Sequence, residues 1–136
     1  MDFLTLEIDV EHANRLVEEG DGQLVDVRLA EELEFFNEIP EALHFPFGVI
    51  QKLAGHDVDE AYAAEVTDFT VQEIGDLYVD MLRSAWGNKT LLVVCRSGNR
   101  SIAATKLLRS LGYPMAYSVS GGVLAWEEKG YKITHK

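Results

Sequence analysis

Short apolar runs alternate with longer amphipathic segments along the whole chain. The apolar runs are bounded by turn residues, as buried strands are, and they lie at 4–8, 23–27, 44–47, 90–94 and 116–119. The run at 90–94 is almost continuously apolar, which is typical of a strand in a parallel sheet that is covered on both faces.

Helical spacing of apolar residues fills the intervals between these runs. Together with caps and terminators, this spacing predicts helices at 9–19, 30–36, 58–66, 70–85, 101–111 and 123–129. Asp9 is placed to cap the first helix, and Thr70 with Glu73 forms a capping box at the start of the fourth. The apolar face of that fourth helix consists of Val71, Ile74, Leu77, Tyr78, Met81, Leu82 and Ala85.

Strands that alternate with helices predict an α/β fold. In such a fold a mainly parallel central sheet is flanked by helices on both faces. The chain has 136 residues, of which 47% are hydrophobic and 26% are charged, and it contains no internal repeat or linker that we can recognise. These values are typical of an ordinary globular protein, and we expect residues 1–136 to form one domain.

The sequence also limits the compartment and the possible cofactors. No apolar stretch reaches the ~18 residues that span a membrane, and the N-terminus lacks the basic segment of a signal peptide, so we expect a cytoplasmic protein without a membrane partner. Cys95 is the only cysteine, which excludes an internal disulfide and a multi-cysteine metal site. His12, His44, His56 and His135 show no metal-ligand spacing, and we expect neither a metal nor a cofactor.

Charge is distributed unevenly along the chain. The formal net charge of −11 disfavours a nucleic-acid partner, because nucleic-acid binders need basic surface. Residues 1–80 carry 21 acidic and 3 basic side chains, whereas residues 81–126 carry six basic and no acidic ones. Acidic residues that solvate one half, with basic residues at helix ends, would explain this pattern. The alternative is an anion-binding site, which is favoured because the only cysteine lies in the basic stretch.

A short loop joins the strand at 90–94 to the following helix. Its residues are Cys95, Arg96, Ser97, Gly98, Asn99, Arg100 and Ser101. Ligands of a parallel α/β sheet bind beyond the carboxyl ends of the strands, where this loop lies. The small residues in its middle let backbone N–H groups turn toward one point, and the helix N-terminus adds partial positive charge there. These dipoles and the two arginines would stabilise a thiolate and cradle an anion.

A purely structural role is the alternative to this chemical role of Cys95. A lone cysteine that ends an apolar strand is more often a small buried hydrophobic residue than a nucleophile. However, a packing cysteine gains nothing from a glycine-containing loop with two arginines, whereas a nucleophile that attacks an anionic substrate needs both. The loop therefore favours a nucleophilic role for Cys95.

In these residues the chain resembles the rhodanese family of sulfurtransferases, over roughly residues 5–131. The segment 95–101 is similar to the active-site loop of that family. Further similarity lies in Asp26-Val27-Arg28, in the Ile39-Pro40 turn with Ala42 and Pro46, in Gly112-Tyr113, and in Gly121-Gly122 followed by Trp126. The chain has Asn-Glu-Ile-Pro-Glu-Ala at 37–42, where the family often has Gly-His-Ile-Pro-Gly-Ala, and its segment 48–69 is longer than a compact member needs.

The resemblance implies a single-domain thiosulfate sulfurtransferase with a rhodanese-like α/β fold. Cys95 would attack an anionic donor such as thiosulfate, hold its outer sulfur as a persulfide, and pass it to a thiol, cyanide or protein acceptor. Asp26 and Arg28 would support the site from a neighbouring strand, or else form a purely structural salt bridge. The residues that would bind the substrate are Arg96, Ser97, Gly98, Asn99, Arg100 and Ser101.

Two other functions remain open at this point. A rhodanese-like interaction or regulatory module would keep the fold and recruit a partner through its acidic half, without efficient turnover. The presence of Cys95 and both loop arginines favours the enzyme over such a module. Related phosphatases carry an arginine six positions after their cysteine, where this chain has Ser101, and Arg100 comes one residue too early.

Overall fold

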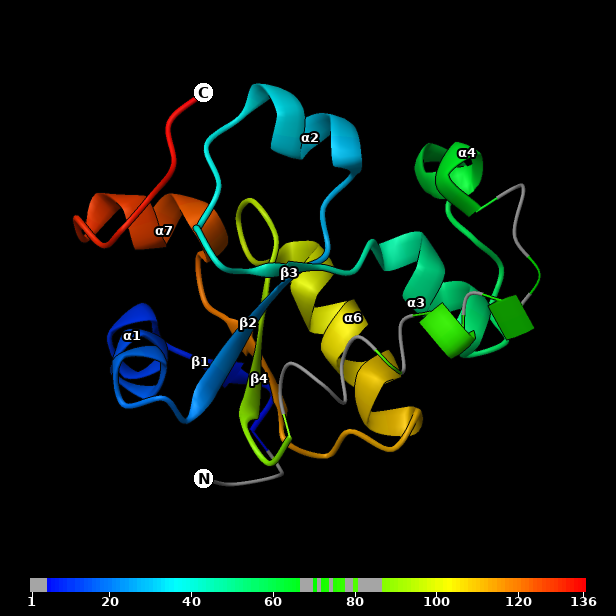
Figure 1. Ribbon diagram of the computed structural model, residues 1–136, viewed down its shortest axis with the longest axis horizontal. Helices are drawn as coiled ribbons and strands as arrows, with labels where there is room; N and C mark the ends of the chain where they lie inside the picture. Colours follow the sequence, from blue (N-terminus) through cyan, green and yellow to red (C-terminus); the bar gives the residue numbers. More distant parts are fainter. Residues whose placement is uncertain (1–4, 67–69, 71, 74, 78–79, 81–86) are drawn as a thin grey trace.

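Five parallel strands form the centre of the fold in the computed structural model, which describes residues 5–66, 70, 72–73, 75–77, 80 and 87–136 (Figure 1). Every strand pair within this sheet is parallel. The predicted α/β class with its parallel sheet is therefore confirmed. The strands, in their order across the sheet, are β1 (Glu7–Ile8), β5 (Ala116–Val119), β4 (Thr90–Val94), β2 (Gly22–Asp26) and β3 (Leu43–His44).

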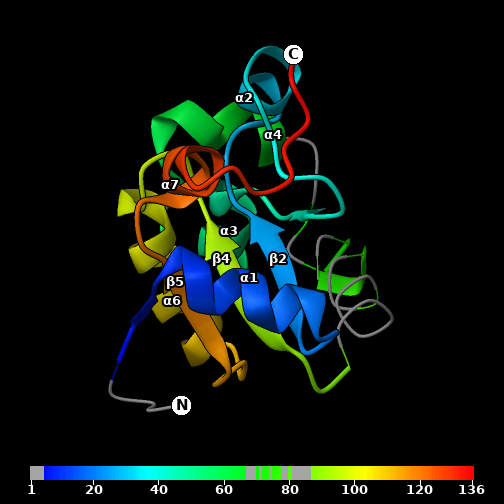
Figure 2. The same cartoon turned by 90° about the vertical axis from the view of Figure 1, so that its left-hand side faces the viewer.

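Helices cover both faces of the sheet, and one short helix lies above its carboxyl edge (Figures 1 and 2). One face is covered by α1 (Val10–Glu18) and α7 (Gly122–Glu128). The other face is covered by α3 (Phe47–Leu53), the 3-10 helix η1 (Glu60–Tyr62), α4 (Ala63–Val66) and α6 (Asn99–Ser110). The helix above the carboxyl ends of β2 and β4 is α2 (Ala30–Phe35).

Alternation along β4 explains why its sequence is apolar throughout. Leu91 and Val93 point into the core beneath α3 and α6, whereas Leu92 and Val94 point into the core beneath α1 and α7. All five residues of the strand are buried. A strand between two helical layers has no solvent-facing side, so it shows no polar alternation.

The helix caps agree with the sequence where the structure describes them. The Asp9 carboxylate accepts the N–H of His12 at 2.7 Å. Glu73 N–H donates to Thr70 Oγ1 at 3.1 Å, and Thr70 N–H donates to Glu73 Oε2 at 2.9 Å, which confirms the capping box. Hydrogen bonds from the backbone and the side chain of Thr70 to the Glu73 carboxylate lower the pKa of Glu73. Leu77, which the sequence places on the apolar face of this helix, is 59% exposed, and the rest of that face lies outside the described residues.

The segment after β2 departs most from the sequence prediction. The predicted strand at 44–47 is shorter, because β3 ends at His44 and α3 begins at Phe47, a helix that the sequence pattern did not predict. Residues 47–51 are all buried, so this segment shows no 3.6-residue period. The predicted helix at 58–66 consists of η1 followed by the single turn of α4. Among the described residues, no helix is both long and apolar enough to cross a bilayer.

A close backbone contact joins α7 to the loop after β4. Val123 N–H donates to the carbonyl oxygen of Cys95 at 2.9 Å, and Leu124 N–H donates to that of Arg96 at 3.1 Å. Gly122 has φ +57°, and a Cβ atom there would lie 2.2 Å from the Cys95 oxygen. Only glycine therefore lets the first turn of α7 bind this loop.

Ionic and backbone hydrogen bonds hold α2 over the carboxyl edge of the sheet. The Glu32 carboxylate accepts two hydrogen bonds from the Arg100 guanidinium, at 2.5 and 2.8 Å, and one from Leu29 N–H at 3.1 Å. Ala30 N–H donates to Glu65 Oε1 of α4 at 2.7 Å. Burial acts to raise the pKa of Glu32, but hydrogen bonds from Arg100 and Leu29 and the charge of Arg100 outweigh it and lower this pKa below its usual 4.5.

We expect Gly122→Ala to destabilise the protein more than Gly20→Ala does. Both glycines have positive φ, but in the part of the chain that the structure describes nothing lies within 4 Å of a Cβ at Gly20. Backbone strain alone costs about 1 kcal/mol at Gly20, whereas strain and overlap with the Cys95 carbonyl together cost about 2–4 kcal/mol at Gly122. Denaturant unfolding of both variants measures this difference, and equal losses would contradict the close contact.

We expect the stability loss in Glu32→Gln to depend on pH. The folded-state pKa of Glu32 is lowered, so its contribution is complete above about pH 4.5 and disappears as pH falls through the folded-state pKa. The loss should be about 1 kcal/mol at pH 7 and shrink toward pH 3. Unfolding curves between pH 3 and 7 measure it, with Glu34→Gln on the exposed side of α2 as the control. A loss that stays constant with pH would show that the ion pair contributes nothing.

Candidate functional site

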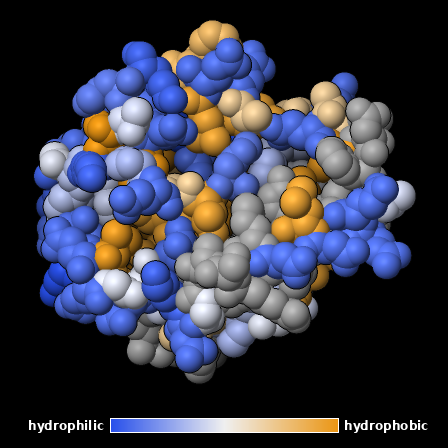
Figure 3. Space-filling model, viewed as in Figure 1, coloured by the Kyte–Doolittle hydropathy of each residue, from blue (hydrophilic) through white to orange (hydrophobic). Residues whose placement is uncertain are grey.

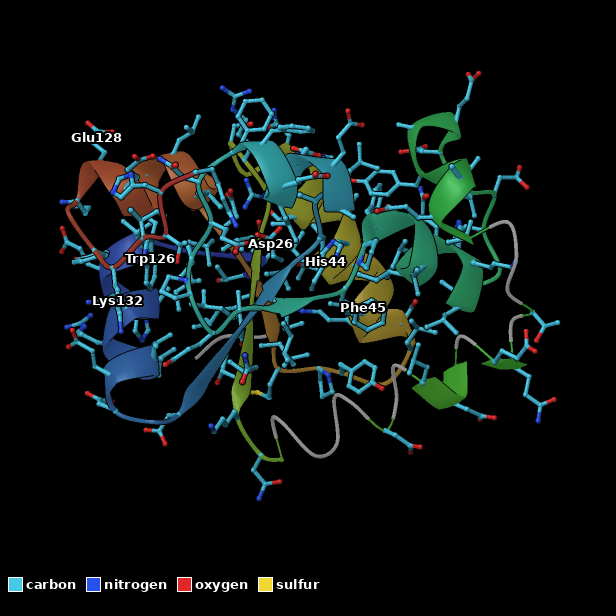
Figure 4. All side chains as sticks on the ribbon, turned by 45° about the horizontal axis from the view of Figure 1, so that its top comes forward. Asp26, His44, Phe45, Trp126, Glu128 and Lys132 are labelled. Carbon is cyan, nitrogen blue, oxygen red and sulfur yellow. The ribbon has the colours of Figure 1, made fainter. Side chains whose placement is uncertain are left out.

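Cys95 lies at the carboxyl end of β4, the central strand of the sheet. Its side chain is buried, with only 1% of the residue exposed. The ends of the neighbouring strands β2 and β3 place Asp26 and His44 at the same edge of the sheet (Figure 4). This is the edge at which parallel α/β sheets bind ligands.

Backbone N–H groups of the loop converge on the sulfur atom. Gly98 N–H donates to Cys95 Sγ at 3.1 Å, and Ser101 N–H donates to it at 3.4 Å. The hydroxyl oxygen of Ser101 lies 3.5 Å from Sγ and forms a 2.7 Å hydrogen bond with the Ser118 hydroxyl of β5. Both N–H groups belong to the start of the twelve-residue helix α6, whose dipole also favours negative charge at this point.

The conformation of Gly98 makes this arrangement possible. Its φ of +101° lies in the left-handed region, and it caps α6 from there. A Cβ atom at this position would lie 3.0 Å from the backbone nitrogen of Gly121. The loop between β4 and α6 is therefore packed against the glycine pair that begins α7.

The two arginines of the loop have different surroundings. Arg96 is exposed, and its guanidinium stacks over the Phe36 ring at 5.2 Å from the ring centre. Arg100 is half-buried and bonded to Glu32, and it also donates to the Tyr62 hydroxyl at 2.9 Å. The ion pair with Glu32 raises the pKa of Arg100, which therefore stays charged.

Tyr62 connects Arg100 to the end of β2. Its hydroxyl donates to the Val27 carbonyl oxygen at 3.1 Å while it accepts from Arg100. Burial raises the pKa of Tyr62 to about 12, so the hydroxyl keeps its proton and can donate. Neither Tyr62 nor Glu32 was among the site residues predicted from the sequence, because both come from segments with no recognisable motif.

Asp26 and Arg28 form a buried ion pair at the end of β2. Arg28 is 1% exposed and Asp26 is 2% exposed. Arg28 Nε donates to both carboxylate oxygens of Asp26 at 3.1 Å, and Nη2 donates to Oδ2 at 2.9 Å. The backbone N–H of Arg28 donates to the same carboxylate at 3.0 Å, and His44 Nε2 lies 2.7 Å from the Arg28 carbonyl oxygen.

A cavity of about 220 Å³ opens beside the loop. Apolar surface is visible over α2, at the top of the molecule (Figure 3). The Asn37 side chain, which lines the cavity, donates to Glu127 Oε1 at 2.8 Å. The cavity is lined by Arg28, Phe35, Phe36, Asn37, Arg96, Val123, Leu124 and Glu127.

The structure thus brings together only some of the residues proposed from the sequence. Gly98 and Ser101 contact the sulfur of Cys95 directly, whereas Ser97 and Asn99 are exposed on the loop. Ser118, which holds the Ser101 hydroxyl beside the sulfur, was not predicted as a site residue, although a serine within an otherwise apolar strand is a usable signal. Within the described part of the chain, no three His, Cys, Asp or Glu residues are grouped so that they could hold a metal ion.

Comparison with known proteins adds evidence from sequence. A family model of the rhodanese-like domain matches residues 9–129. Rhodanese-like domain-containing protein 17 of Arabidopsis thaliana is 29% identical over 140 residues, covering 95% of this chain and 74% of that protein. Thiosulfate sulfurtransferase GlpE of Pseudomonas syringae is 32% identical over 119 residues, covering 88% of this chain and 84% of that protein.

Solved structures show the same architecture. The human single-domain sulfurtransferase TSTD1 superposes with a TM-score of 0.63 at 27% identity, over 92% of this chain and 97% of that one. A rhodanese-related protein of Thermoplasma volcanium superposes with a TM-score of 0.61 at 22% identity, over 96% of this chain and 98% of that one, and it supports the fold alone. With a family model that matches nearly its whole length, this chain belongs to the rhodanese-like domain family, whose named members include thiosulfate sulfurtransferases.

Proposed function

We propose that this protein is a single-domain sulfurtransferase, extending over residues 1–136, that carries sulfur on Cys95. The observation that carries the proposal is the convergence of the Gly98 and Ser101 N–H groups on Cys95 Sγ at the start of α6. These dipoles stabilise a thiolate, which is the nucleophilic form of cysteine. They stabilise a negatively charged persulfide at the same place in the same way.

Both half-reactions follow from this arrangement. The Cys95 thiolate attacks the outer sulfur of thiosulfate, a new S–S bond forms, and the bond between the two thiosulfate sulfurs breaks. Sulfite leaves with the electron pair of that bond, and the anionic persulfide remains on Cys95. A nucleophilic acceptor, such as cyanide or a thiolate, then attacks the outer sulfur and releases the Cys95 thiolate.

The near-complete burial of Cys95 supports a sulfur carrier. Only 1% of the residue is exposed, so the thiolate itself is poorly placed to meet a large partner. A persulfide adds one sulfur at about 2 Å from Sγ and extends the reach of the side chain by that distance. Thiosulfate is small enough to load the site, and the longer loaded side chain can meet the acceptor.

The charges around the loop suit an anionic donor. Arg96 carries a guanidinium on the exposed side of the loop, and Arg100 stays charged beside Glu32. In our proposal these two arginines and the loop amides, including those of Ser97 and Asn99, hold the donor. Asp26 and Arg28, paired with each other, support the site from the end of β2. The cytoplasm as the place of this reaction remains a prediction from the sequence.

We expect Cys95→Ser to abolish sulfur transfer and keep the fold. A hydroxyl has a similar volume to a thiol but forms no persulfide, and the chain has no second cysteine to replace it. Intact mass after incubation with thiosulfate should show one added sulfur, removable by cyanide, on the wild-type protein only. Wild-type transfer of sulfur from thiosulfate to cyanide by this variant would overturn the proposal.

An unreactive but folded protein would instead indicate an interaction module. In that case the wild-type mass would stay unchanged by thiosulfate. A phosphatase would be indicated by hydrolysis of an aryl phosphate that depends on Cys95 and is as fast as sulfur transfer. The same protein samples therefore separate all three functions.

We expect Arg96→Ala and Arg100→Ala each to weaken use of thiosulfate. Loss of one charge-assisted hydrogen bond in a partly desolvated site costs about 1–3 kcal/mol of transition-state stabilisation, or about 5- to 150-fold in kcat/KM. Lys106→Ala removes an exposed cation from the same helix, away from the loop, and serves as the control. If all three variants lose the same small amount, net charge rather than the loop arginines governs donor binding.

A further inference from the structure

Exposed apolar side chains gather around the cavity beside the loop. Single exposed hydrophobic residues are ordinary in proteins, but a cluster at one cavity calls for an explanation. Three of the four exposed large hydrophobic residues in the described chain line this cavity. These three are Phe35, Phe36 and Leu124, with exposed fractions of 63%, 48% and 47%.

A buried cation lies among the residues that line the same cavity. Arg28 is 99% buried, yet it belongs to the cavity wall. Its side-chain hydrogen bonds to Asp26 leave from Nε and Nη2, and within the described part of the chain none engages Nη1. Arg96 adds a second guanidinium to the lining, stacked on Phe36. The cavity therefore combines apolar walls with donors for an anionic group.

Among the described residues that line the cavity, one carries a carboxylate, and it is already hydrogen-bonded. Glu127 is engaged by the side-chain amide of Asn37 at 2.8 Å. This hydrogen bond occupies one carboxylate oxygen of Glu127. Two guanidinium groups and one hydrogen-bonded carboxylate therefore line the space, with Arg28 also paired with Asp26.

The cavity also lies next to the sulfur carrier in the chain. Arg96 directly follows Cys95, and Val123 donates its N–H to the Cys95 carbonyl oxygen at 2.9 Å. Both residues line the cavity. The cavity therefore lies against the backbone that carries Cys95.

The size of the cavity limits its occupant. Its volume is about 220 Å³. A buried cavity of about 150 Å³ accommodates benzene, whereas pockets for drug-sized ligands measure about 300–1,000 Å³. The space therefore suits one ring, or an apolar group of similar size, together with one small anionic substituent.

We propose that this cavity binds the sulfur acceptor, and that the acceptor is a small thiol with an apolar, ring-sized body and one anionic group. The inference rests on the proposed function of Cys95. The acceptor thiolate attacks the outer sulfur of the persulfide, and a new S–S bond forms as the bond from that sulfur to Cys95 Sγ breaks. The Cys95 thiolate leaves with the electron pair of that bond, and the negative charge of the persulfide stays on the transferred sulfur, so the step balances and is redox-neutral.

The first test compares two acceptors with the full-length protein loaded from thiosulfate. 4-Mercaptobenzoate has the ring and the anionic group, whereas cyanide has neither a ring nor an apolar body. We expect Leu124→Ala and Phe35→Ala each to lower the ratio of kcat/KM for mercaptobenzoate to kcat/KM for cyanide by about three- to tenfold, because apolar contact is lost. Leu77→Ala, which removes an exposed leucine outside the cavity, should leave this ratio unchanged.

The ratio separates acceptor binding from general damage to the site. A variant that merely disturbs the loop slows both acceptors equally and leaves the ratio unchanged. An unchanged ratio in both cavity variants, or the same fall in Leu77→Ala, would overturn the proposal.

A second test does not require Cys95 to react. Benzenesulfonate has a ring and an anionic group but no thiol, and calorimetric titration measures its binding to the unloaded protein. We expect binding to the wild type and to Cys95→Ser, and at least threefold weaker binding to Leu124→Ala. If no persulfide forms but this binding pattern holds, the proposed function fails, but the cavity is still a site for an apolar ring with an anionic group. Absent binding, or equal binding to all variants, would overturn the cavity proposal itself.

Discussion

The buried ion pair between Asp26 and Arg28 fixes the end of β2, and the rest of the site is built on that end. Removing two charges from water costs free energy, so a buried ion pair fixes the geometry of its surroundings more than it adds net stability. Here one carboxylate binds both the guanidinium and the backbone N–H of Arg28, which sets the turn after the strand. The carbonyl oxygen of Arg28 then forms a hydrogen bond with His44, and the preceding carbonyl oxygen accepts one from Tyr62. The Tyr62 hydroxyl in turn accepts a hydrogen bond from Arg100. The position of the loop after β4 is thereby tied to the neighbouring strand.

Under the proposed function, short-range dipoles explain how an acidic chain holds an anionic donor. The net charge is −11, and two of the three arginines at the site are paired with a carboxylate, Arg28 with Asp26 and Arg100 with Glu32. Distant acidic side chains are screened over about 8 Å at physiological ionic strength, whereas N–H groups at 3.1–3.4 Å act directly on the sulfur. The uneven charge along the sequence therefore identifies the right segment, but the N–H groups that contact the sulfur come from the backbone.

The sequence predicts those parts of the fold that leave a local signal. β4 and β5 have the predicted bounds, because short apolar runs between turn residues mark strands buried on both faces. The loop after β4 was likewise evident from its glycine, arginines and cysteine. The bonds from Arg100 to Glu32 and Tyr62 span 68 and 38 residues and have no local signature, so they emerge only from the structure. The same is true of the cavity, since its walls come from three separate segments.

The solitary position of Cys95 also determines how the protein responds to oxidants. A sulfenic acid formed on this residue has no second thiol in the chain with which to close a protective disulfide, and further oxidation is irreversible. Burial of the sulfur limits the approach of such reagents. If Cys95 carries sulfur as proposed, an oxidant meets the outer sulfur first, and that sulfur is attached through an S–S bond that an external thiol can cleave. Oxidative damage then falls on a replaceable atom, and the Cys95 sulfur is returned as a thiolate.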